Sequence, residues 1–156
     1  MKREGVVMLA AALEPGYWST VGQGVSAIAL YTIVGVALVV LGFFVIDWTT
    51  PGPLRTLVMA GRPNAAAIAA AGVVSIALIV VLTIYSSSGD LIQGLLGTLV
   101  FGVLGLLGQA LCVRLIGLVT GIDIGRVLAA ERFVPEVLVV VAAYVAFALI
   151  IGVAIL

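Results

Sequence analysis

Four long apolar segments without a charged side chain constrain this 156-residue chain more than any other feature of its sequence. They lie at residues 24–46, 65–85, 91–113 and 137–156. A helix needs about 20 mostly apolar residues to cross the hydrocarbon layer of a bilayer, and each segment meets that requirement. Soluble proteins do not place four such segments in succession. The sequence therefore predicts an all-α integral membrane protein with four transmembrane helices.

The composition excludes several classes of function. Charged residues make up 9% of the chain, against roughly 25% in a soluble domain, so they cannot cover a core with a polar surface. Seven basic and seven acidic residues cancel, which leaves no basic face for nucleic acid. With no His and one Cys, the chain lacks the usual ligands for a metal cluster or a haem and cannot form an intrachain disulfide. We expect no metal, no cofactor and no enzyme activity.

The first 23 residues differ from the rest of the chain. Their apolar stretch, residues 5–13, is too short to span a bilayer, and no small-residue cleavage site follows it as in a signal peptide. We expect residues 1–23 to lie in the membrane interface, with Tyr17 and Trp18 at the level of the lipid headgroups.

The distribution of Lys and Arg predicts the orientation. The N-terminal tail carries Lys2 and Arg3, whereas the link at residues 86–90 and the C-terminus carry no basic residue. The connections after the first and third spans carry five: Arg55, Arg62, Arg114, Arg126 and Arg132. Because cytoplasmic segments carry an excess of Lys and Arg, we expect these connections in the cytoplasm and both termini outside.

A shift of about 70 residues aligns the two halves of the chain without a gap. The match continues through the polar connections, where Thr50 falls on Thr120 and Arg62 on Arg132. Two spans in each half keep both halves in the same orientation. The sequence therefore predicts a tandem parallel repeat of two-helix units, at residues 24–86 and 90–156.

Each connection is expected to hold a short interfacial helix. Thr50-Pro51 places a capping hydroxyl before a proline that suits a first helical turn, and Thr120 with Asp123 resembles a capping box. Four arginines then face the headgroups: Arg55, Arg62, Arg126 and Arg132. Two interpretations stay open. The arginines either hold the orientation and contact anionic lipid, or they form a docking surface for a cytoplasmic partner.

Gln109 is the one strong hydrogen-bonding side chain well inside a predicted span. It belongs to a stripe of residues spaced three and four apart: Gly94, Thr98, Gly102, Gly105, Gln109 and Cys112. Such a stripe lets helices approach closely, and a Gln within it can form a hydrogen bond across the contact. We expect tight packing within a protomer or between protomers, with a pore-lining or ligand-contacting Gln109 as the alternative.

Three further residues stand at the ends of predicted spans. Asn64 follows Pro63 at the start of the second span, where it either caps that helix or makes a functional contact. Asp47 and Arg114 end the first and third spans on the same side of the membrane, so they could form an ion pair.

Several of these residues together resemble the bacterial domain-of-unknown-function 350 family of YjfL-type inner-membrane proteins. The matching features are Thr50-Pro51, Leu57, Gly61, the run Asn64-Ala65-Ala66-Ala67-Ile68, Asp90, Gln109 and Arg114. The resemblance covers nearly all of the chain beyond about residue 25. It implies a bacterial inner-membrane location, a tandem two-helix repeat, no established activity and a membrane-stress context.

The leading hypothesis for function is a non-catalytic membrane scaffold. It would form homo-oligomers through Gly and Ala faces, contact membrane lipids, and present its Arg-bearing connections to a cytoplasmic membrane-stress protein. The absence of ionisable residues within the spans argues against coupled transport. An oligomeric channel or uncoupled permease is the alternative, with a polar line formed by Tyr31, Thr32, Asn64 and Gln109. Lipid binding by the arginines is a third hypothesis.

Overall fold

The computed structural model describes Glu4 and residues 16–50, 52–87 and 90–156, and all regular secondary structure in this part of the chain is helical. Four helices are long and apolar enough to cross a membrane: α2 (Tyr17–Thr49), α4 (Pro63–Ser86), α5 (Leu91–Thr120) and α7 (Glu136–Ile155). The prediction of four membrane helices is thus confirmed. Two six-residue helices, α3 (Leu54–Met59) and α6 (Ile124–Ala129), lie in the connections.

The two longest helices extend beyond the predicted spans. Helix α2 begins at Tyr17 and not at residue 24, so residues 17–23 belong to this helix and do not form a separate segment. The predicted interfacial location of residues 5–15 lies outside the described residues. Helix α5 continues past Val113 to Thr120 and is followed by its C-cap Gly121, whose left-handed backbone (φ 68°) suits glycine. At 33 and 30 residues, these helices must tilt or project beyond the hydrocarbon layer.

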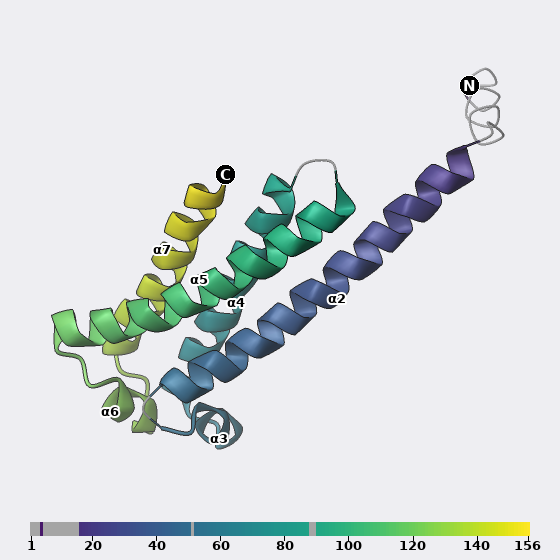
Figure 1. Cartoon of the computed structure of the whole chain (residues 1–156). Coiled ribbons are helices and arrows are strands. Elements are labelled where there is room, and N and C mark those ends of the chain that lie inside the picture. Colours follow the sequence, from purple (N-terminus) through teal and green to yellow (C-terminus); the bar gives the residue numbers. More distant parts are fainter. Residues whose placement is uncertain (1–3, 5–15, 51, 88–89) are drawn as a thin grey trace. The chain divides into compact units, whose positions relative to one another are not determined.

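The chain divides into two compact units, residues 1–33 and 34–156. The first unit contains the N-terminal half of α2, where large apolar side chains such as Val25 and Ile28 are exposed. The second unit holds the C-terminal half of α2 and all other helices, and it is centred on α4, which contacts both α5 and α7. Within it, α3 and α6 lie at the end where α4 and α7 begin (Figure 1).

Glycines bring the membrane helices of the second unit close together. A Cβ atom added to Gly105 of α5 would lie 2.8 Å from Ile79 Cγ2 of α4, and one at Gly102 would lie 2.6 Å from Leu38 Cδ1 of α2. Both distances are shorter than real Cβ contacts, so a larger residue at either position would force the Leu38 or Ile79 side chain to shift. The predicted small-residue stripe therefore packs within one protomer: Gly94, Thr98, Gly102, Gly105 and Gln109 are all buried, and Cys112 is half-buried.

Candidate functional site at the connector end

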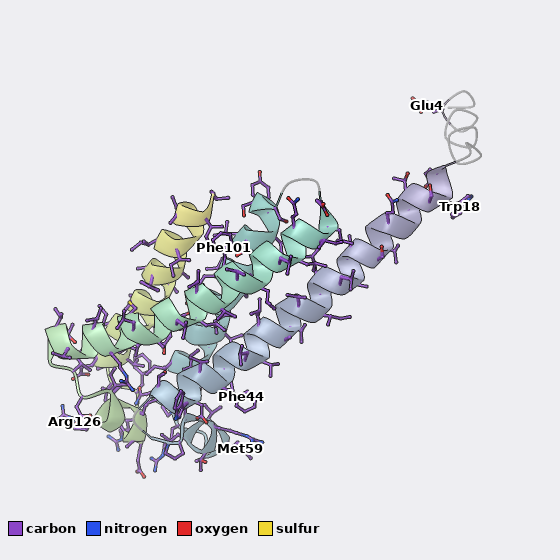
Figure 2. All side chains as sticks on the ribbon, in the orientation of Figure 1. Glu4, Trp18, Phe44, Met59, Phe101 and Arg126 are labelled. Atoms are coloured by element: carbon purple, nitrogen blue, oxygen red, sulfur yellow. The ribbon has the colours of Figure 1, made fainter. Side chains whose placement is uncertain are left out.

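Two polar segments meet at one end of the second unit. The first connector, residues 50–62, joins α2 to α4, and the second connector, residues 121–135, joins α5 to α7. We call this region the connector end. Contacts between α3 and α6, and of both with α4, make it one packed layer. Figure 2 labels Met59 on the first connector and Arg126 on the second.

Asp47 caps the helix of the first connector. Its Oδ1 accepts a hydrogen bond at 2.9 Å from the backbone N–H of Arg55, the second residue of α3. The predicted cap, Thr50, instead donates its hydroxyl back to the carbonyl of Ile46 at 2.6 Å. The prediction of a Thr50 cap is therefore wrong, because the hydroxyl is already engaged by the preceding helix; Pro51 lies outside the described residues.

The second connector repeats this arrangement with a different capping residue. Thr120 donates to the carbonyl of Ile116 at 2.7 Å, whereas Asp123 Oδ1 accepts from Arg126 N–H at 3.1 Å and caps α6. The predicted capping box, with Thr120 as the N-cap, is corrected: Thr120 is the last residue of α5, and Asp123 alone is the N-cap. A side-chain oxygen in either place could satisfy the free N–H groups of a helix start, and here the carboxylate does so.

Asn64 joins the two connectors. Its side chain is completely buried, and its Nδ2 donates to the carbonyl of Arg132 at 2.8 Å and to that of Ala130 at 3.4 Å. Its Oδ1 accepts from the backbone N–H of Val134 at 3.1 Å. The amide thus satisfies three backbone groups of the second connector, while no side-chain bond caps α4. The predicted cap is therefore absent, and Asn64 instead makes a structural contact with the chain's own second connector; a functional contact of Asn64 stays a prediction.

The acidic side chains of the connector end are engaged in structural contacts. Asp47 and Asp123 cap helices, and Glu131 Oε1 lies 3.0 Å from Arg62 Nη1. This ion pair joins the two connectors at the surface, where such pairs contribute up to about 1 kcal/mol. Three arginines remain exposed and have no ion-pair partner among the described residues: Arg55, Arg126 and Arg132. The connector end therefore presents free guanidinium groups.

Arg114 lies beside a cleft and not in an ion pair with Asp47. The predicted Asp47–Arg114 pair is absent from the described residues, since Asp47 binds the backbone of α3. The cleft has a volume of about 600 Å³ and opens between the end of α2, the end of α5 and the start of α6. Its lining includes Trp48, Val113, Arg114, Leu118 and Asp123.

Gln109 is buried within the helix bundle without a polar partner. Its side chain is 2% exposed, and neither Nε2 nor Oε1 forms a hydrogen bond. The other buried polar side chains of the spans, Ser75, Thr83 and Thr98, each donate to a carbonyl one turn earlier in their own helix. Among the described residues, Gln109 is the one buried side chain whose N and O atoms have no hydrogen-bond partner, and an amide buried in this way is costly.

Tyr144 is a polar contact that the sequence analysis missed. It lies on α7, is 1% exposed, and its hydroxyl interacts with the side chain of Thr50 at the end of α2. The tyrosine in an otherwise apolar span could have predicted such a contact, because a buried tyrosine hydroxyl usually finds a hydrogen-bond partner. This interaction connects α7 with the start of the first connector.

These features define an integral membrane protein with a polar layer at one end of its second unit, and the described residues contain no group of three or more metal-ligating side chains. The chain belongs to the Domain of Unknown Function 350 family, whose family model matches residues 19–155. The resemblance seen in the sequence is thereby confirmed.

Mycobacterial proteins are among the relatives. A UPF0719 transmembrane protein of Mycobacterium bovis and one of Mycobacterium tuberculosis are each 46% identical over 81 residues, which cover 51% of this chain and 53% of the relative. A UPF0719 transmembrane protein of Mycolicibacterium paratuberculosis is 41% identical over 92 residues, 57% of this chain and 61% of the relative. The chain spans about half the length of the first two relatives. No solved structure matches the chain.

Proposed function

We propose that this protein is a non-catalytic scaffold of the bacterial inner membrane that uses its connector end to recruit a cytoplasmic partner. The observation that carries the proposal is the set of hydrogen bonds that joins the two connectors: the buried Asn64 amide binds three backbone groups of the second connector. A docking surface needs groups held in fixed positions, because ordering them on binding costs affinity. Three exposed arginines stand on this ordered layer.

The proposal includes a tandem repeat of two-helix units with interfacial helices α3 and α6. These helices begin at Leu54 and Ile124 and end at Met59 and Ala129, so both bounds differ by the offset of 70 residues seen in the sequence. Thr50 and Thr120, which have the same offset, donate to the equivalent carbonyls of Ile46 and Ile116. Parallel repeats of this kind place both connectors on one side of the membrane.

The arginines of the connectors favour a cytoplasmic location for this end. Both termini then lie on the opposite side. Partner residues that suit Arg55, Arg126 and Arg132 are carboxylates or phosphorylated side chains, because guanidinium groups bind such oxyanions through paired hydrogen bonds. A cytoplasmic membrane-stress protein with an acidic face meets this requirement. The buried glycines of α4 and α5 serve the protomer itself, so a homo-oligomer would use the exposed outer faces of its helices.

Replacement of the three exposed arginines tests the proposed scaffold. We expect the variant Arg55→Gln, Arg126→Gln, Arg132→Gln to lose at least about 90% of a bound cytoplasmic protein, because each charge-assisted contact contributes on the order of 1 kcal/mol or more. The measurement is quantitative mass spectrometry of protein retained with polymer-excised membrane discs at equal expression. A photo-crosslinker at position 126 distinguishes direct contact from chance retention.

The control for this experiment is Gln93→Ala, which changes an exposed polar side chain at the start of α5, the end opposite to the connectors. We expect it to retain the partner fully. Unchanged recruitment by the triple variant, with the crosslinker at position 126 joined only to lipid, would contradict the scaffold.

A further inference from the structure

The cleft beside Arg114 has the size and setting of a ligand site. Its volume of about 600 Å³ falls within the range of roughly 300–1,000 Å³ that is usual for small-molecule pockets. It opens at the end of α5, where the helix continues beyond the predicted span and carries its one charged side chain, Arg114. The cleft therefore lies where the apolar part of the bundle gives way to the connector end.

The apolar part of the lining suits lipid and not water. Trp48, on one side of the cleft, is 88% exposed, and Leu118, on another, is 83% exposed. Large apolar side chains this exposed at a helix end indicate contact with the membrane, and tryptophan is enriched at the level of the headgroups. An acyl chain passing these residues would bring its headgroup to Arg114.

The charged part of the lining has both signs. Arg114 has no ion-pair partner among the described residues, and Asp123 uses only its Oδ1, to accept from the Arg126 N–H. The second carboxylate oxygen of Asp123 and the whole Arg114 guanidinium are thus free to bind a ligand. One positive and one negative group in one cleft match a ligand that carries one anionic and one cationic group.

We propose that this cleft binds the headgroup of an amine-bearing zwitterionic phospholipid, with its phosphate at Arg114 and its ammonium group at Asp123. A guanidinium forms paired hydrogen bonds with a phosphodiester, and a primary ammonium donates hydrogen bonds to a carboxylate. An anionic lipid has no cationic group, so the Asp123 carboxylate would face a negative or neutral headgroup without forming an ion pair. A choline headgroup has no N–H to donate. The site is separate from the three arginines of the proposed docking surface.

Native mass spectrometry of the full chain, released from detergent with defined lipids, tests this site. We expect phosphatidylethanolamine to be retained about tenfold more than phosphatidylglycerol or phosphatidylcholine with the same acyl chains, the effect of about one charge-assisted hydrogen bond. Arg114→Gln lowers that retention about tenfold, and Asp123→Asn removes the preference for ethanolamine. Asparagine is a good N-cap, so Asp123→Asn leaves α6 intact.

Arg126→Gln is the matched control, because it removes an exposed arginine of the same connector that does not line the cleft. It should bind phosphatidylethanolamine as the unmodified protein does. Equal retention of the three lipids, or no effect of Arg114→Gln, would overturn the proposal. Soluble glycerophosphoethanolamine that competes as well as the whole lipid would also overturn it, since the ligand would then be a free phosphoamine.

Discussion

Asn64→Leu is expected to lower the free energy of unfolding by about 3 kcal/mol or more, the largest loss of any single substitution considered for this protein. Leucine has a similar size but forms no hydrogen bonds. It would leave three backbone groups of the second connector without their partner: the carbonyls of Ala130 and Arg132 and the N–H of Val134. A fully buried group left unpaired costs roughly 1–3 kcal/mol; these three bonds are part-buried, and their combined loss would also remove the link between the two connectors.

Unfolding in detergent, followed by near-ultraviolet circular dichroism, measures this loss. Gln93→Leu is the control, because it replaces an exposed amide with the same apolar side chain at the other end of the bundle. Its expected effect is within about 0.5 kcal/mol. A similar, small change in both variants would contradict the role assigned to Asn64.

Gln109→Leu is expected to have the opposite sign and to raise the free energy of unfolding by about 2 kcal/mol. The amide is 2% exposed and neither of its polar atoms has a partner. Leucine has a similar volume, so the substitution removes the cost of an unpaired amide and preserves the packing of α5. The same unfolding measurement applies, with Gln93→Leu again as the exposed control.

The outcome at Gln109 also separates the scaffold from the channel or permease. A scaffold predicts a more stable Gln109→Leu variant and equal ion leak from liposomes with and without protein. A less stable variant would mean that the assembled protein supplies the amide with a polar partner. An ion leak that changes with Gln109→Leu would contradict the scaffold. The channel hypothesis placed Asn64 in a polar line, but the Asn64 side chain is engaged by the backbone of the second connector.

The sequence predicted the membrane helices well because hydropathy and length determine them directly. It also identified the stripe through Gly102 and Gly105, since small residues at helical spacing face a neighbour whatever that neighbour is. It did not predict which residues cap the connector helices. Thr50, Asp47 and Asp123 all have oxygens within reach of a helix start, and the choice depends on where α2 and α5 end. Only the structure determines those ends.

The contacts between distant residues, such as those that join the two connectors, could not be predicted from the sequence for a different reason. Asn64 stands 70 residues before Val134, and Tyr144 meets Thr50 across most of the chain. No local pattern records such pairings. The repeat offset was the one available clue for Asn64, because Val134 is the position on which Asn64 falls when the halves are aligned. The sequence thus singled out Asn64 as a span-end residue, but it did not show that Asn64 binds Val134.

The central claim is that the connector end faces the cytoplasm, and single-cysteine labelling tests it most directly. In a Cys112→Ser background, Met59→Cys marks the connector end and Tyr85→Cys the opposite end; the native side chains are 79% and 80% exposed. A membrane-impermeant maleimide is applied to spheroplasts and to inside-out vesicles. The account predicts that Tyr85→Cys reacts in spheroplasts and Met59→Cys only in inside-out vesicles. Reaction of Met59→Cys in intact spheroplasts would contradict it.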